Sequence, residues 1–421
     1  MVRLLDPTSA FIRDAFAEYY QHFQAPAPTS IQKREFAFAT LAERMMLRHK
    51  SFKTAELLKE YLASLVPSDV YYSCAYYDDP EAEMDKKGWL GSDLIFDIDA
   101  DHIQTSCGKI HDEWVCMECD LRGKGLVPDR CPACGGQKFN VKTWPCEDCL
   151  GSARSEAIKL LDVLSNDFGF PETEMHAFFS GHRGYHVHIE SEIIRELDSG
   201  ARKEIVDYIC GLGLDTSIFG LDESFGRGKQ ASKRSRLGDQ GWHRRIAKTM
   251  RDLVLNASCE DYENLGVGKN VVGTIMKNKG EILRGWNSDA PYPIVRGIGL
   301  ETWRKLFKYS VSSASAEIDT VVTTDTHRLI RLAGALHGKT GFKKIEFPVS
   351  KIIDFDPFKT AVAFKKGTVS IFVSNAPRFR IGDEAFGPYK DQKVELPTAA
   401  AVLLICRNRA EVVERDVRRA I

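Results

Sequence analysis

The chain has 421 residues, a length that allows two or three ordinary domains. Its composition, 43% hydrophobic and 28% charged, is typical of a folded protein, and no apolar stretch reaches the ~18 residues of a membrane span. The first residues mix acidic and apolar side chains instead of forming a signal-peptide core, so we expect a cytoplasmic protein. The 58 basic and 59 acidic side chains nearly cancel, which excludes a strongly basic surface over the whole molecule.

A nucleic-acid-binding surface would therefore have to be local. Residues 227–251 carry nine Lys or Arg against one acid, Asp239, with Trp242 as their only aromatic side chain. This segment is either a basic binding patch or a solvated charged loop.

The first hundred residues alternate helix and strand patterns. Pro7 is favoured at a first helical position, and Phe11, Ala15 and Tyr19 repeat at helical spacing. In chain order we expect a helix over 7–23, a hairpin from strands in 34–41 and 45–52, a helix over 54–65 and a strand within 68–77.

The rest of the chain returns to strands after a helical stretch. We expect a strand at 94–99, a helix over 152–168, two strands and a glycine turn in 176–190, and a mainly helical, basic region over 191–300. Further strands are expected at 321–325, 344–350 and 361–374, before a helix from Ala399. The fold class is therefore α/β (α+β), with mixed sheets flanked by helices.

Asp97 and Asp99 stand two residues apart in LIFDID, so their carboxylates share one face of the expected strand. They would repel each other unless a cation lay between them, and a pair of Mg²⁺ or Mn²⁺ ions would supply that charge for phosphoryl transfer. Taken alone, the pair is a weak signal, and an exposed strand end or a helix cap would explain it better.

The segment SGHRGYH adds a second set of polar groups. Gly181 and Gly184 permit a tight turn, Arg183 can grip phosphate oxygens bidentately, and His186 shares a face with His188. Together with Ser180, these residues suit a triphosphate site. The alternative is a hairpin whose histidines stay at the surface or in the core.

Seven of the eleven cysteines fall between Cys107 and Cys149, which favours metal binding over disulfides in a chain of this size. Three CxxC pairs with one Cys and one His give eight ligands, enough for two closed Zn²⁺ sites. The inner four look like a small zinc ribbon and the outer four would form the other site; they are, respectively, Cys116, Cys119, Cys131 and Cys134, and Cys107, His111, Cys146 and Cys149. Exchange of pairs, His102 in place of His111, and free cysteines remain open.

Four segments in this order, REFAF, DLIFDID, SGHRGYHVHI and HRLIRLAGALHGKTG, resemble the small catalytic subunit of the archaeal and eukaryotic replicative primase. The resemblance implies a third metal-binding aspartate on a later strand, Asp319, with Asp325 as competitor. It also implies a set of nucleotide-binding residues: Glu35, Arg48, Ser180, Arg183, His186, Arg331, His337 and Lys339.

Some positions depart from the family pattern. Ala333 and Ala335 stand where the family usually has Pro and Ser, and His182 occupies a variable position. The family carries one structural zinc, held after the DxD strand and by a later CxxC, which makes the inner ribbon an insertion.

The resemblance implies a nucleotidyltransferase that makes short primers on single-stranded DNA from NTPs or dNTPs. It also implies a large subunit with an iron-sulfur cluster and a replicative polymerase as partners, in the cytoplasm of an archaeal-type cell or in a eukaryotic nucleus. The alternatives are a repair or end-joining primase-polymerase, and a non-catalytic zinc-ribbon subunit that binds nucleic acid.

No Walker A or G-x-S-x-G motif is present, which argues against P-loop ATPases and α/β-hydrolases. We expect residues 1–106, 150–190 and 301–421 to form the catalytic core, 107–149 a zinc-binding insertion, and 191–300 a separate helical subdomain.

Overall fold

The computed structural model describes residues 6–24, 26–41, 45–223, 225, 235–287 and 295–413. The chain forms two compact units: unit 1 comprises Met1–Ala157, Glu172–Arg202 and Ile318–Ile421, and unit 2 comprises Ile158–Pro171 and Lys203–Glu317. The expected α+β class is confirmed, and every strand pairing in the described residues is antiparallel. Among these residues, no helix has the length and apolar character needed to cross a membrane.

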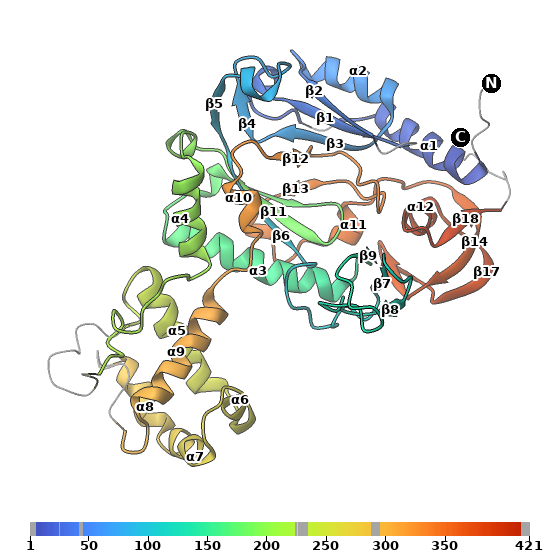
Figure 1. The fold of residues 1–421 in the computed structure, drawn as a ribbon. Helices are drawn as coiled ribbons and strands as arrows, with labels where there is room; N and C mark the ends of the chain where they lie inside the picture. The colour runs from blue at the N-terminus through green and yellow to red at the C-terminus, as the bar shows by residue number, and fades with distance from the viewer. Residues whose placement is uncertain are drawn as a thin grey trace. The chain divides into compact units, whose positions relative to one another are not determined.

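The first sheet of unit 1 carries the expected hairpin. Its strand order is β12-β3-β1-β2, with β12 Leu329–Arg331, β3 Pro67–Ser73, β1 Phe36–Thr40 and β2 Met46–Lys50. Helices α1 (Pro7–Gln21) and α2 (Ala55–Leu65) lie beside it (Figure 1). The carboxylate of Asp6 caps α1 and the hydroxyl of Thr54 caps α2, which explains why both helices begin where the sequence predicts.

The second sheet positions the polar residues of the DxD and glycine-turn segments. Its order is β13-β10-β11-β6, with β13 Ile345–Phe347, β10 Met175–Phe179, β11 Gly184–Ile189 and β6 Leu94–Asp99. The register of β11 on β6 puts His186 opposite Asp97 and Gly184 opposite Asp99. A Cβ atom at Gly184 would lie 2.2 Å from the carbonyl oxygen of Ile98, so only glycine permits this approach.

The expected strand at 321–325 is wrong, because this segment is the short helix α10, Thr320–Thr324. The carboxylate of Asp319 accepts hydrogen bonds from the backbone N–H groups of Val321 and Val322. This N-cap stabilises a helical turn against the β preference of the branched side chains.

The last part of unit 1 is a three-stranded sheet with a buried helix. The sheet has the order β17-β14-β18, from β17 Tyr389–Pro397, β14 Thr368–Ala376 and β18 Ala410–Val412. The strand expected over 361–374 thus begins only at Thr368, after Gly367 at φ 81°. The helix expected from Ala399 is α12, Thr398–Cys406. Unit 1 also contains two antiparallel strand pairs, β4–β5 (Ala75–Tyr77, Trp89–Ser92) and β15–β16 (Phe379–Ile381, Glu384–Phe386), and the short helix α11 (Pro357–Thr360).

The cysteine-rich segment folds as a small sheet of its own. Strands β7 (Glu113–Cys116), β8 (Arg122–Lys124) and β9 (Phe139–Lys142) form a sheet in the order β8-β7-β9. Helix α3, Glu147–Asn166, begins five residues before the expected start at Ser152. Two acidic residues, Glu147 and Asp148, lie in its first turn, where the positive end of the helix dipole stabilises them.

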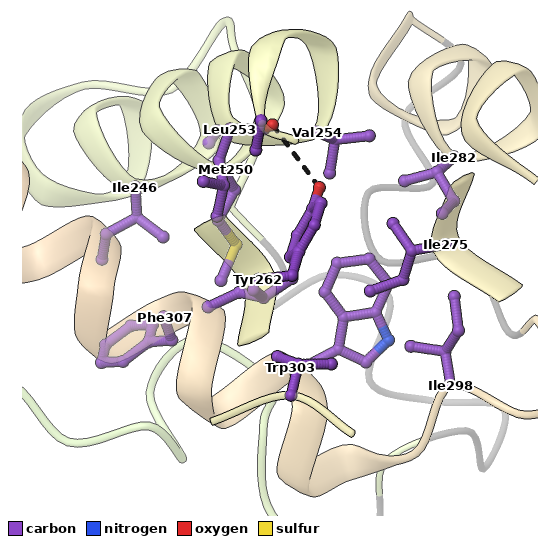
Figure 2. Packing of buried hydrophobic residues seen from close by; sticks show 14 of the residues in the cluster. Ile246, Met250, Leu253, Val254, Tyr262, Ile275, Ile282, Ile298, Trp303 and Phe307 are labelled. Atoms are coloured by element: carbon purple, nitrogen blue, oxygen red, sulfur yellow. Dashed lines mark hydrogen bonds between the residues drawn. The ribbon is translucent and has the colours of Figure 1, made fainter. Parts of the chain in front are cut away.

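Unit 2 is mainly helical, as expected for this part of the sequence. Its helices include α5 Gly241–Asn256, α6 Cys259–Asn264, α7 Lys269–Lys277, α8 Lys279–Asn287 and α9 Leu300–Ala314. Tyr262 and Trp303 are fully buried in its core, and the Tyr262 hydroxyl donates to the carbonyl of Leu253 at 3.5 Å (Figure 2). Helix α4, Ser199–Ile209, contributes residues to both units.

Positions 227–234 of the basic segment lie outside the described residues. In the described part, Trp242 is 4% exposed and packs in the core of unit 2, so its ring is not available to stack on a base. Arg245 is paired with Asp162 and Asp167. The described half of the segment thus uses its aromatic ring and one of its cations for structure.

Candidate active site and metal centres

A cleft of about 240 Å³ opens where β6 ends beside the glycine turn and the 327–339 segment. The cleft brings together seven of the predicted site residues from three separate parts of the chain: Asp97, Asp99, Ser180, His186, Arg331, His337 and Lys339. Carboxylates from β6 thus face hydroxyl, imidazole and cationic groups from the two other segments.

Asp319 lies next to the carboxylate pair. Its backbone N–H donates to the carbonyl of Asp97 at 2.8 Å. Burial raises the pKa of Asp97 to about 7, and the negative charges of Asp99 and Asp319 add to this rise. Asp325 instead accepts a hydrogen bond from the backbone of His327 at 2.9 Å.

The carboxylates of Asp97 and Asp99, with Asp319 beside Asp97, form an oxygen-rich donor set, and hard divalent cations such as Mg²⁺ or Mn²⁺ prefer such ligands. His186 lies beside them, with its Nε2 3.4 Å from Oδ1 of Asp97. The donor set therefore fits the metals that the sequence predicts.

The glycine turn is held together by Ser180. Its Oγ accepts the backbone N–H groups of His182 at 3.3 Å and Gly184 at 3.2 Å. Gly181 adopts φ 89°, a left-handed conformation that glycine adopts without strain, and it lies close to His337. Because its oxygen accepts two backbone donors, the Ser180 hydroxyl keeps its own proton for a ligand in the cleft.

The 327–339 segment supplies the other wall. Nδ1 of His337 accepts the backbone N–H of Lys339 at 3.1 Å, which leaves Nε2 to carry the proton. The His337 ring stacks on His182 with centroids 5.0 Å apart. Burial and then the charge of Arg331 hold the pKa of His337 well below its usual range, so the ring is neutral and acts as a hydrogen-bond donor.

Arg331 is held by a fixed set of partners. Its guanidinium forms an ion pair with Asp69 and donates to the carbonyl of Leu336 at 3.1 Å. The side chain lines the cleft while only 8% of the residue is exposed, so Asp69 fixes how it faces a ligand.

Three predicted nucleotide-binding residues do not line this cleft. Arg183 is 1% exposed and forms ion pairs with Asp101 and Asp112. Glu35 is also 1% exposed, and it receives the side chains of Arg48 at 3.0 Å and Lys87 at 3.4 Å. The charges of Arg183, Glu35 and Arg48 are therefore paired with other side chains of the protein.

The two predicted sets of zinc ligands come together as two groups, and the ligand atoms of each lie within 4.8 Å of one another. In the first group, here called site 1, Cys107, His111, Cys146 and Cys149 converge, and His102 takes no part. In the second, site 2, the Sγ atoms of Cys116 and Cys134 lie 3.6 Å apart, as do those of Cys119 and Cys131. Both groups have the ligand types and number of a closed tetrahedral site, so each could hold a metal ion.

A comparison with known families identifies the chain. The family model for the DNA primase small subunit matches residues 142–349, which include the glycine turn and the 327–341 segment. The DNA primase small subunit PriS of Methanothrix thermoacetophila is 34% identical over 96% of this chain and 99% of its own length. The chain belongs to the DNA primase small subunit family. Proteins of the same printed name from Methanospirillum hungatei and Nitrosopumilus maritimus are 32% and 29% identical, again over 96% of this chain and over 97% and 98% of their own lengths.

Membership of the primase small subunit family supports a primase role and a nucleotidyl-transferring polymerase activity. Asp97 and Asp99 precede the segment that the family model matches, so the cleft geometry is what connects them to the matched motifs.

Sequence reasoning missed several residues that line the cleft or support the residues lining it. Lys344 is fully buried, and its Nζ donates to the carbonyl of Arg331 at 2.9 Å and lies 3.3 Å from Nε2 of His188. Burial and then the charge of Arg331 lower the pKa of Lys344 to about 7. In the sequence, Lys344 is visible only as a cation at the start of the strand-like segment KIEF. Asp69 and Tyr71 are likewise polar positions within an otherwise apolar strand.

Proposed function

We propose that this chain is the catalytic small subunit of a DNA primase, a nucleotidyltransferase (EC 2.7.7.-) that synthesises short primers on a single-stranded DNA template. One observation carries the proposal: Asp97 and Asp99 line one cleft, with Asp319 next to Asp97, and the other wall of the cleft offers Ser180, His337 and Lys339. Metal ligands on one side and phosphate donors on the other are what nucleotidyl transfer requires.

The three carboxylates would hold two Mg²⁺ or Mn²⁺ ions. When bound, such ions neutralise charge on the triphosphate and on the attacking and leaving oxygens. The fit rests on the electrostatics of Asp97, whose pKa is raised by burial and then by the negative charges of Asp99 and Asp319, because a divalent cation would compensate these charges.

The protein's own groups orient the nucleotide. The Ser180 hydroxyl and Nε2–H of His337 donate to phosphate oxygens, and Lys339 and Arg331 add positive charge. Because Asp69 fixes the Arg331 guanidinium and His182 stacks on His337, these donors are ordered before the nucleotide binds. A hydroxyl of a bound nucleotide or primer then attacks the α-phosphate of the next nucleotide, and pyrophosphate leaves.

Glu35 and Arg48 belong to the proposal as neighbours of the incoming nucleotide, where the Glu35 carboxylate orients the half-exposed Arg48 guanidinium. The family name "small subunit" supports a large-subunit partner, for which the sequence resemblance suggests an iron-sulfur protein, and a replicative polymerase that extends the primer.

Primer synthesis tests the proposal directly. The chain is incubated, alone and with a candidate large subunit, with single-stranded template, labelled nucleotides and Mg²⁺ or Mn²⁺. Wild type should yield short products, and Asp97→Ala/Asp99→Ala should lower the yield by at least about 10³-fold because the metal ligands are gone.

The matched control is Asp78→Ala/Asp79→Ala, which removes two carboxylates from the same unit but outside the cleft. Products that persist in the Asp97/Asp99 variant would refute the metal assignment. Extension of supplied primers without any new primers would instead favour a repair or end-joining primase-polymerase.

A further inference from the structure

One buried carboxylate, Asp112, lies between site 1 and the active cleft. It is 3% exposed and follows the site 1 ligand His111 directly in sequence. Its Oδ1 accepts a hydrogen bond from Nδ1 of His111 at 2.8 Å and from the backbone N–H of Trp144 at 2.9 Å. The other ring nitrogen of His111, Nε2, faces the sulfurs of Cys146 at 3.0 Å and Cys107 at 3.4 Å.

This geometry fixes the histidine for metal binding. A ligating histidine commonly donates its second N–H to a carboxylate, which sets the tautomer and the ring orientation. Asp112 therefore supports site 1 even though it is not one of the four ligands.

The same carboxylate also binds Arg183. One terminal nitrogen of the guanidinium donates to both oxygens of Asp112, at 2.8 and 3.0 Å, and the other forms an ion pair with Asp101. Asp101 lines the active cleft, and its backbone N–H donates to Oδ1 of Asp99 at 2.9 Å. A continuous series of polar contacts thus runs from His111 through Asp112, Arg183 and Asp101 to Asp99.

The Arg183 guanidinium is held by its two carboxylate partners, Asp101 and Asp112. It is 1% exposed, and its carbonyl accepts the backbone N–H of Ala100 at 3.2 Å, which places it on the end of the strand that carries Asp99. Buried cations of this kind depend on both of their carboxylate partners, because removing one leaves charge without compensation.

We propose that Asp112 is a positioning residue that couples metal occupancy of site 1 to nucleotide binding in the cleft. Metal at site 1 holds His111, His111 holds Asp112, and Asp112 orients Arg183 against Asp101 at the end of the Asp99 strand. The proposal concerns site 1 alone and assigns no such role to the cysteines of site 2. The proposal rests on the proposed function for the identity of the ligand.

Coupling of this kind is reciprocal, which makes it measurable without primer synthesis. The parent chain for the test is Cys119→Ser/Cys134→Ser, which retains only the metal of site 1. It is loaded with Zn²⁺, and release to a chromogenic chelator is followed with and without Mg²⁺ and NTP. We expect Mg²⁺ and NTP together to slow release severalfold in the parent chain.

Asp112→Asn should release Zn²⁺ about 10- to 100-fold faster and should lose the effect of the nucleotide, since the amide cannot serve both His111 and Arg183 as a charged acceptor. Asp129→Asn, an exposed carboxylate of the same module, is the matched control and should stay within about twofold of the parent.

Asp101→Asn provides a second variant that leaves every contact of site 1 intact. Release without nucleotide should then match the parent, while the slowing by nucleotide should be reduced. Unchanged release and unchanged coupling in both variants would overturn the proposal. Coupling in a chain that makes no primers would refute the proposed function and leave this inference standing.

Discussion

At the scale of single residues, the cleft is organised by backbone register more than by flexible side chains. Because β11 pairs with β6 so that His186 faces Asp97, the proposed phosphate-binding motif and the proposed metal-binding motif share one pair of strands. Gly184 makes the pairing possible, since any larger side chain would collide with the carbonyl of Ile98.

The raised pKa of Asp97 predicts a pH-dependent stability in buffer without Mg²⁺ or Mn²⁺. An aspartate whose pKa is about 7 in the folded protein and 3.8 when unfolded contributes stability while it is protonated and loses it as pH rises from about 4 to 7. Asp97→Asn stays neutral throughout. It should therefore be more stable than wild type at pH 8, by about 2 to 4 kcal/mol, with the difference vanishing near pH 4.

Urea unfolding across this pH range measures the difference, with the exposed Asp14→Asn as control. Addition of Mg²⁺ at pH 8 should stabilise wild type and not the variant. An Asp97→Asn protein that is less stable than wild type at pH 8 would contradict the prediction.

Much of the residue-level site could be predicted from sequence, because short motifs fix the side chains that share a strand face. What sequence could not show is which partners a charged side chain chooses. Arg183 lies in the glycine turn, a position that suits phosphate binding, yet it is buried between Asp101 and Asp112. Asp112 is 71 residues away in the sequence, and Asp101 is farther still. Long-range ion pairs of this kind leave no periodic signal.

At the scale of elements, most helices and strands begin near the positions that periodicity and caps predict. The exception at 321–325 shows why a short apolar segment is ambiguous: its branched side chains favour a strand, but the cap from Asp319 decides for α10. Asp319 thereby sits at the helix N-terminus with its backbone tied to Asp97.

The two cysteine groups predict a metal content that elemental analysis can measure. Purified wild type should contain about two Zn²⁺ per chain, and Cys116→Ser/Cys119→Ser about one, because each group supplies a full set of four ligands. Cys210→Ser/Cys259→Ser, which removes two cysteines outside both groups, should still contain two. One Zn²⁺ or none in wild type would refute the two-site interpretation.

At the scale of the whole molecule, the two units have separate hydrophobic cores, and we expect them to respond separately to core substitutions. Trp303 is 1% exposed in the core of unit 2. Trp303→Ala should destabilise that unit by about 3 to 5 kcal/mol through lost packing and a cavity.

Thermal or urea unfolding should show one transition moved by this change and a second one near its wild-type position. Leu255→Ala, at an exposed position of α5, is the control and should move neither by more than about 0.5 kcal/mol. Equal shifts of both transitions would show that the units unfold as one.

The ribbon inserted between the two halves of site 1 has a consequence for how that site closes. His111 and Cys146 are 35 positions apart, but β7 and β9 pair with Glu113 opposite Lys142. Once β7 pairs with β9, the effective loop between His111 and Cys146 shrinks to about six residues, which lowers the entropic cost of closing it by about 1 to 2 kcal/mol. The folded segment between the two halves of site 1 therefore brings His111 and Cys146 together at a lower entropic cost than an unstructured linker of the same length would.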